Sequence, residues 1–177
     1  MSYKYFIVNN IVFDNEYLTI KEDYLLLMLY KYRDTKTNVA SPQEDYLLRM
    51  LDCSKRTLRR YTKNLEKYGL IDKQTRRGKD NEYKLLNVSD GGFTIIPSSL
   101  VATHENFLYQ DMVYSHLCRL AGKSNSAWIS LNRLAARVKC GRGNLLPAIN
   151  DLEDCMWIKK TKKGRCNFYK VEKGDIS

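Results

Sequence analysis

The chain has 177 residues, of which 30 are Lys or Arg and 20 are Asp or Glu, so its formal net charge at neutral pH is +10. This length fits one medium domain or two small ones, and the charge favours a polyanionic partner. The longest apolar run, residues 24–30, is far shorter than the roughly 20 residues that cross a bilayer. Residues 1–10 lack the apolar stretch of a secretion signal. We therefore expect a cytoplasmic protein with no membrane partner.

The cysteines and the two histidines bear on redox compartment and metal binding. The five cysteines are scattered and form no C-x-x-C pair: Cys53, Cys118, Cys140, Cys155 and Cys166. An odd, dispersed set is not typical of a disulfide framework, and a zinc site needs about four clustered ligands. We expect reduced thiols, no bound metal and no cofactor.

In chain order, the first predicted element is a helix from Ile20 to about Arg33. A second helix is predicted to begin at residues 41–44, Ser-Pro-Gln-Glu, and to end near Asp52. In that start signal the Ser would cap, the Pro suits the first helical position and the Glu would complete a capping box. Ser54 is predicted to cap a third helix, which Gly69 ends.

The third helix shows the clearest periodicity, and two strands of a hairpin follow it. Four residues spaced by about 3.6 predict its buried face: Leu58, Tyr61, Leu65 and Tyr68. The strands are expected in residues 70–75 and 81–86, joined by a basic tip around Gly78.

Residues Tyr24–Tyr30, in the first predicted helix, are apolar nearly all round. Such a helix is usually buried on more than one side. It either packs between its own hairpin and the rest of the chain or forms the surface of a homodimer. Ten of the thirteen tyrosines lie in the first 88 residues, mostly at core spacings, so we assign them to the core.

The sequence contains an internal repeat. The segment RRGKDNEYKL (76–85) recurs as KKGRCNFYKV (162–171), and matched leucines and cysteines precede both at an offset of 87 residues. We infer two copies of one unit, about residues 5–87 and 93–171, joined by the polar, Gly-rich stretch 87–92. The predicted domains are therefore 1–88 and 89–177.

The second unit is expected to repeat the elements of the first. It has a predicted helix at about 105–121, a helix at 131–138 capped by Ser130, a helix at about 144–155 and a hairpin at 157–171. Gly122 would end the first of these helices. The predicted fold class is α+β and mainly helical.

This order of elements resembles the winged-helix family, in which a helix–turn–helix precedes a two-stranded wing. Residues 41–71 and 130–158 are similar to its helix–turn–helix core, and FTIIPSSL (93–100) is similar to the entry strand of winged helices in phage and plasmid proteins of Gram-positive bacteria. The resemblance covers nearly the whole chain. It implies two winged-helix domains in tandem and a nucleic-acid partner.

The positive charge is segregated within the first unit. Residues 53–85 hold eleven Lys or Arg and four Asp or Glu, net +7, whereas residues 1–52 hold six and eight, net −2. Along the third helix four basic residues are spaced by 4, 3 and 4 and so share one face: Arg56, Arg60, Lys63 and Lys67. Like charges on one helix face are mildly unfavourable, which favours a function in binding an anion.

A helix of this kind suits the major groove of double-stranded DNA. Arg bonds guanine bidentately, and phosphates take Lys and Arg less selectively. We assign Arg56 and Arg60 as base readers, with Thr57 as a further reader. Phosphate contacts are assigned to Lys55, Arg59 and Lys63, and backbone or minor-groove contacts to Arg76, Arg77 and Lys79 at the first wing tip.

The second unit keeps a basic wing but not a basic third helix. Its wing carries six basic residues: Lys159, Lys160, Lys162, Lys163, Arg165 and Lys170. We assign Lys160, Lys162, Lys163 and Arg165 to phosphate contacts. In its helix Leu146, Pro147 and Asn150 replace Arg59, Arg60 and Lys63, and a proline is tolerated only near the first turn. Arg142 and Asn144 remain as DNA contacts. We expect this helix to pack against protein, so a protein partner at the second domain is an alternative.

No catalytic constellation is evident. Residues 122–124, GKS, would need Gly at position 117 to form a phosphate-binding loop, and Leu117 stands there. We expect no enzyme activity. The expected function is sequence-specific binding of double-stranded DNA for a mobile element, as a transcriptional regulator or as an accessory factor at an origin or transfer site. The alternatives are a plasmid or phage replication initiator and a winged-helix module for protein–protein interaction.

Overall fold

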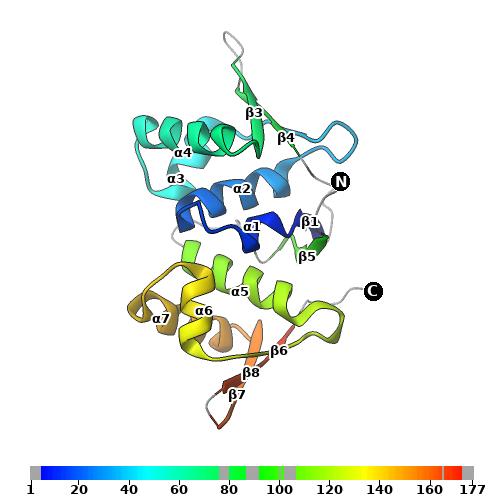
Figure 1. Ribbon diagram of the computed structural model, residues 1–177, viewed down its shortest axis with the longest axis vertical. Helices are drawn as coiled ribbons and strands as arrows, with labels where there is room; N and C mark the ends of the chain where they lie inside the picture. The colour runs from blue at the N-terminus through cyan, green and yellow to red at the C-terminus, as the bar shows by residue number, and fades with distance from the viewer. Residues whose placement is uncertain are drawn as a thin grey trace.

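The computed structural model describes residues 5–75, 80–86, 92–99, 101, 107–164 and 166–172. Within these ranges the fold is mixed α and β, with helices and small antiparallel sheets, which confirms the α+β class (Figure 1). None of the helices in these ranges is long and apolar enough to cross a membrane. In chain order the elements are β1 (Tyr5–Asn9), α1 (Ile11–Asp14), α2 (Ile20–Tyr32), β2 (Val39–Ala40), α3 (Glu44–Leu51), α4 (Lys55–Lys67), β3 (Ile71–Gln74), β4 (Glu82–Leu85), β5 (Phe93–Pro97), α5 (Leu108–Ala121), the 3-10 turn η1 (Gly122–Ser124), β6 (Ser126–Ile129), α6 (Leu131–Val138), α7 (Arg142–Asp154), β7 (Ile158–Lys163) and β8 (Cys166–Val171).

The two halves of the chain have the same order of elements. Each has a long helix, a short strand, two helices and a hairpin, and the short strand pairs with the last strand of the hairpin. The sheet orders are β2-β4-β3 and β6-β8-β7. The registers also correspond, since Ala40 pairs with Tyr83 in one sheet and Ala127 with Tyr169 in the other. We call β3–β4 the first hairpin and β7–β8 the second hairpin.

The long helices α2 and α5 pack against each other in the middle of the molecule (Figure 1). The two hairpins project from opposite ends of the view, whereas α4 and α7 lie toward the same side. This arrangement places the first and second hairpins far apart along the long axis of the molecule.

A two-stranded sheet joins the halves. Strand β1 runs antiparallel to β5, with Val8 opposite Thr94 and Phe6 opposite Ile96. Asn10 reinforces the connection, because its N–H donates to the carbonyl of Gly92 at 3.1 Å and its Oδ1 accepts from Thr94 Oγ1 at 2.8 Å. The strand in β5 was expected, whereas β1, α1, β2 and β6 were not. Of the expected linker 87–92, residues 87–91 lie outside the described part.

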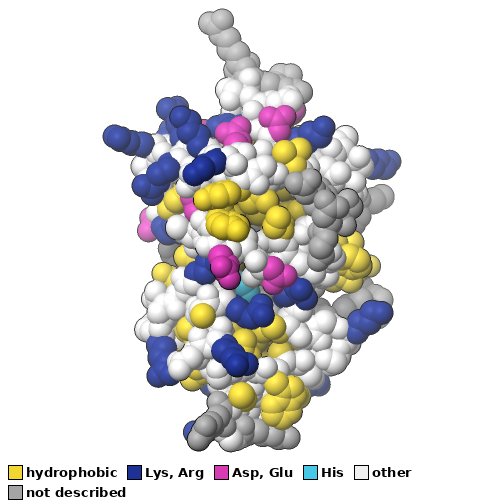
Figure 2. All heavy atoms as spheres, viewed as in Figure 1, with side chains coloured by type: hydrophobic (Ala, Val, Ile, Leu, Met, Phe, Trp, Pro, Cys, Tyr) yellow, Lys and Arg dark blue, Asp and Glu magenta, His cyan; other side chains and the backbone are white. Residues whose placement is uncertain are grey.

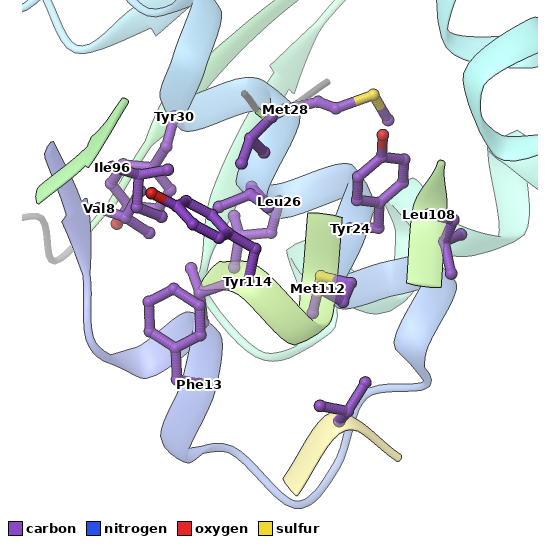
Figure 3. Close-up of a cluster of buried hydrophobic side chains, with 14 of the residues drawn as sticks. Val8, Phe13, Tyr24, Leu26, Met28, Tyr30, Ile96, Leu108, Met112 and Tyr114 are labelled. Carbon is purple, nitrogen blue, oxygen red and sulfur yellow. The ribbon is translucent and has the colours of Figure 1, made fainter. Parts of the chain in front are cut away.

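One hydrophobic core spans both halves. Residues from β1, α1 and α2 interdigitate with residues from β5 and α5, as Figure 3 shows for ten labelled side chains: Val8, Phe13, Tyr24, Leu26, Met28, Tyr30, Ile96, Leu108, Met112 and Tyr114. At the helix contact Tyr24 Oη donates to Asp111 Oδ2 at 2.6 Å, and both groups are buried. Residues Tyr24–Tyr30 are at most 2% exposed. They pack within the chain, so the homodimer interpretation of this helix is wrong.

Charged side chains also cross the boundary between the halves. Lys139 Nζ lies 2.7 Å from Asp23 Oδ2 and also donates to Asn15 Oδ1 at 3.0 Å and to the carbonyl of Leu18 at 2.9 Å. Burial raises the pKa of Asp23 to about 6, although Lys139 acts in the opposite direction. Desolvation of the buried Asp23 offsets part of its attraction to the half-buried Lys139, so we infer that this contact orients the halves more than it stabilises them.

Some predicted boundaries are wrong. Helix α3 begins at Glu44 with Gln43 as its N-cap, and neither Ser41 nor Gln43 makes a side-chain cap. The helix starts later than predicted because Gln43 is still extended, with φ of −59° and ψ of +136°. Helix α5 begins at Leu108, after Phe107 as N-cap, and ends before Gly122 as expected. Residues 105 and 106 lie outside the described part.

The assignment of the tyrosines to the core holds only in part. Tyr24, Tyr30, Tyr61 and Tyr83 are buried, but Tyr5, Tyr17, Tyr32 and Tyr68 are exposed. Tyr68 was predicted to continue the buried face of α4, yet it is the C-cap residue and its ring stacks on that of Tyr17, with 5.4 Å between the ring centroids. The 3.6-residue spacing of buried side chains does not extend to Tyr68, because α4 ends at Lys67.

Candidate nucleic-acid interface

Helix α4 is built from a well-defined start and one apolar face. Asp52 adopts a left-handed conformation with φ of +43°, which turns the chain from α3 into α4. Ser54 is then the N-cap, and its Oγ accepts from the N–H of Thr57 at 3.3 Å. On the inner face Leu58, Tyr61 and Leu65 are buried, as their spacing predicts.

Two polar contacts fix the orientation of α4 on the scaffold. Asn64 Nδ2 donates to the buried Glu22 Oε1 at 2.6 Å, and Glu22 Oε2 in turn accepts from the N–H of Thr19 at 2.8 Å in a capping box of α2. At the other side of α4, Glu66 Oε1 accepts from the N–H of Lys73 on β3 at 3.2 Å. The helix is therefore held by both α2 and the first hairpin.

The outer face of α4 carries six basic side chains, all exposed: Lys55, Arg56, Arg59, Arg60, Lys63 and Lys67. With Glu66 the helix has a net charge of 6 − 1 = +5. In Figure 2 a cluster of Lys and Arg covers the region of α4, toward the upper left. We call these six side chains the α4 basic face. It gathers five of the predicted site residues of the first half.

Three local contacts refine the predicted roles on this helix. Lys55 Nζ lies 3.1 Å from Glu44 Oε1, so part of its charge is already neutralised. The Arg60 guanidinium lies over the ring of Tyr61, 5.6 Å from its centroid, while the side chain remains exposed. Thr57 is half-buried with its hydroxyl 3.1 Å from Ser54 Oγ, so it serves the helix cap.

Helix α7 occupies the matching place in the second half with a different surface. Its buried face is formed by Leu145, Ala148, Ile149 and Leu152. Its outer face exposes Asn144, Leu146, Pro147 and Asn150, and its net charge is 1 − 3 = −2. Arg142 donates through Nε to Asn132 Oδ1 of α6 at 3.0 Å, and its Nη2 contacts the same oxygen.

One expectation for α7 needs a correction. The helix begins at Arg142, two residues earlier than predicted, so Pro147 lies beyond the first turn and inside the helix. Its missing N–H is the one that would bond to the carbonyl of Gly143. The outer face exposes Leu146 and Pro147, so the expected packing of this helix against protein concerns a partner and stays a prediction.

The second hairpin differs from the prediction in how its lysines are used. Lys162 is exposed, as a phosphate contact requires. Lys160 instead pairs with Glu153 at 3.3 Å, and its N–H donates to the same carboxylate at 3.1 Å, so it ties β7 to α7. Some predicted tip residues lie outside the described part of the chain: Arg76, Arg77 and Lys79 in the first hairpin and Arg165 in the second. The structure describes the backbone of Lys163 but not its side chain.

A cleft of about 530 Å³ opens between the halves, away from α4. Its walls are formed by α1 with the turn after it and by α6, including Asp14, Arg137 and Lys139. These charges are paired across it, because Asp14 contacts Arg119 at 3.1 Å and Arg137 at 3.7 Å while Lys139 contacts Asp23. The cleft is therefore a polar seam between the halves and presents no surplus charge to a polyanion. Within the described ranges no three His, Cys, Asp or Glu side chains are placed to hold a metal ion.

Comparisons with known proteins give little guidance. No family model matches the chain, and no curated protein matches it. Among solved structures the chain is similar to the crystal structure of the DIP2311 protein from Corynebacterium diphtheriae, with 15% sequence identity and a TM-score of 0.29. The alignment covers 86% of this chain and 26% of that one. At this TM-score the likeness carries no argument about fold or function.

Proposed function

We propose that the chain is a non-enzymatic protein that binds double-stranded DNA sequence-specifically, with α4 as the recognition helix of the first of two tandem winged-helix units. The observation that carries the proposal is the α4 basic face, with a net charge of +5 on a helix held rigidly by Glu22 and Lys73. A helix with exposed Arg and Lys on one side fits the major groove, where Arg reads guanine and Lys contacts phosphate.

The arrangement of the surrounding elements supports this proposal. The first hairpin follows α4 directly and lies beside it, so both can meet one duplex. The charge of the scaffold is low by comparison, because residues 1–52 carry a net charge of −2. With the resemblance to phage and plasmid winged helices, we propose a cytoplasmic role for a mobile element, in transcription control or at an origin or transfer site. Initiation of replication is the alternative within DNA binding.

A second function is favoured for α7. Its exposed face is partly apolar, with Leu146 and Pro147 beside Asn150, and its charge is negative. Such a surface repels phosphate and suits a protein partner. The proposal therefore assigns DNA reading to the first half and leaves the helix of the second half for contacts with protein.

The salt dependence of binding tests the proposal. If about six phosphates are neutralised, the logarithm of the affinity for a duplex should fall with the logarithm of salt concentration with a slope near −5. The measurement is a gel shift or fluorescence anisotropy titration with random duplex at several salt concentrations. An affinity that stays flat from low to high salt would rule out DNA binding and favour the protein-interaction module.

A further inference from the structure

The outer face of the second sheet, β6-β8-β7, carries an exposed aromatic pair. Trp128 on β6 is directly opposite Phe168 on β8, and the ring centroids lie 4.8 Å apart with the planes tilted by 57°. Trp128 is 57% exposed and Phe168 is half-buried. Trp and other aromatic side chains are enriched where proteins bind ligands and partners, so an exposed pair of this kind favours a binding surface.

Cations flank the pair on the same face. The register places Thr161 of β7 beside Phe168, and the neighbouring row consists of Ser126, Lys170 and Lys159. Lys159 and Lys170 are exposed, and Lys170 Nζ contacts Glu172 at 3.1 Å. The face thus combines two flat apolar rings with positive charge.

The first sheet provides an internal comparison. Its registers align Tyr83 with Tyr169 and Ala40 with Ala127, so Phe168 corresponds to Glu82 and Trp128 to Ser41. The matching face of the first sheet carries Asp72 and Glu82 around Lys84. The same scaffold therefore presents acids in the first half and aromatic rings with lysines in the second, so this sheet architecture forms without rings at these positions.

We propose that this face binds unpaired bases of a single-stranded nucleic acid, with Trp128 and Phe168 stacking on bases and Lys159 and Lys170 contacting phosphates. Aromatic rings beside cations form the usual platform for single strands, because every base has a face on which a ring can stack. In a duplex these faces are already covered by neighbouring base pairs. The site is distinct from the α4 basic face and does not depend on the proposed duplex binding.

The test uses the full chain and fluorescein-labelled oligonucleotides of about 12 nucleotides, oligo-dT and oligo-U, with a hairpin duplex as comparison. Loss of one stacked base lowers affinity by about 5- to 150-fold, so Trp128→Thr should weaken oligo-dT binding within that range and leave duplex binding within twofold. Trp128→Phe keeps a ring and should lose less. The control Phe93→Thr changes another exposed aromatic residue, on β5, and should leave both affinities unchanged. Comparing the two oligonucleotides shows whether DNA or RNA is preferred.

Tryptophan fluorescence of the unaltered protein provides a second measurement that does not depend on a variant folding. Stacking on Trp128 should quench its emission as oligo-dT is added, with a midpoint equal to that of the anisotropy titration. The other tryptophan, Trp157, is half-buried against Tyr114 with the ring centroids 5.9 Å apart, so its emission should change less. Unchanged oligo-dT affinity in folded Trp128→Thr, an equal loss in Phe93→Thr or an absence of quenching would each overturn the proposal. The aromatic pair would then be a protein contact.

Discussion

Helices α4 and α7 occupy matching places in a repeated architecture, yet their outer faces differ in almost every respect. Both are 13 residues long, both follow a left-handed residue at the end of the preceding helix, and both bury leucines at matching positions. Helix α4 has a net charge of +5 and exposes its basic side chains on the outer face. Helix α7 has a net charge of −2 and exposes Leu146 and Pro147 there. Packing constrains the inner faces of both helices, whereas it leaves the outer faces free to differ.

The largest expected effects concern what the two helices share. Leu65 and Leu152 are buried at matching positions, so Leu65→Ala and Leu152→Ala should each lower the free energy of unfolding by about 2–5 kcal/mol. Because one core spans both halves, urea unfolding followed by circular dichroism should show a single transition in each variant. Leu146→Ala, on the exposed face of α7, is the control and should change stability by about 0.5 kcal/mol or less. Two separated transitions would show that the halves unfold independently.

The next prediction concerns where the helices differ. Arg56→Ala and Arg60→Ala should each weaken binding to the cognate duplex by about 1–3 kcal/mol and relax the preference at one base, because base contacts carry specificity. The cognate site comes from selection in a random duplex pool, and each variant is titrated with cognate and scrambled DNA. Asn150→Ala, at the position in α7 that matches Lys63, is the control and should change neither affinity. A loss of specificity in Asn150→Ala alone would make α7 the reading helix.

A smaller difference is predicted between α2 and α5. Residues 23–29 align with residues 111–117 at an offset of 88, so His116 occupies the place of Met28. Neither ring nitrogen of His116 has a hydrogen-bond partner in the described structure, and burial lowers its pKa to about 3. Between about pH 3 and 6.5 the unfolded chain therefore binds more protons than the folded one, and acidification destabilises the fold. From pH 7.5 to 5 this amounts to about 2 kcal/mol.

The measurement compares the unaltered protein with His116→Met, which installs the residue of the first half. Urea unfolding at both pH values should show the extra loss of about 2 kcal/mol only when the histidine is present. Asp23, whose pKa is raised to about 6, acts in the opposite direction below that pH. Its contribution is present in both proteins and cancels in the difference. Parallel pH dependences of the two proteins would contradict a buried neutral His116.

The sequence predicts local features of this fold better than distant ones. The start of α4 and its buried leucines follow from a Ser cap and a 3.6-residue period, and both are confirmed. Strand β1 was not predicted because its partner strand begins only at Phe93, far along the chain, so no local hairpin signal marks it. The Ser-Pro-Gln-Glu signal at residues 41–44 was misleading. Strand β2 ends at Ala40, directly before it, and helix α3 begins only at Glu44.

The candidate site shows the same limit. A spacing of three and four residues was sufficient to predict that Arg56, Arg60 and Lys63 share an exposed face. Charge alone did not reveal that Lys160 is held by Glu153 or that Lys55 contacts Glu44, because these pairs depend on how a helix meets a hairpin or a preceding helix. The role of these residues in binding DNA stays a prediction.

The pairing of β1 with β5 has a consequence for the order in which the chain is made. Strand β1 leaves the ribosome early, but its partner, Phe93–Pro97, emerges only after the whole first half has been synthesised. During that interval the nascent chain presents an unsatisfied strand edge, with Phe6 and Val8 not yet covered by Ile96. Such an edge is a template for pairing with other chains, so we expect the nascent chain to be most prone to aggregation between the synthesis of β1 and that of β5. This exposure of the strand edge ends when β5 has been synthesised and pairs with β1.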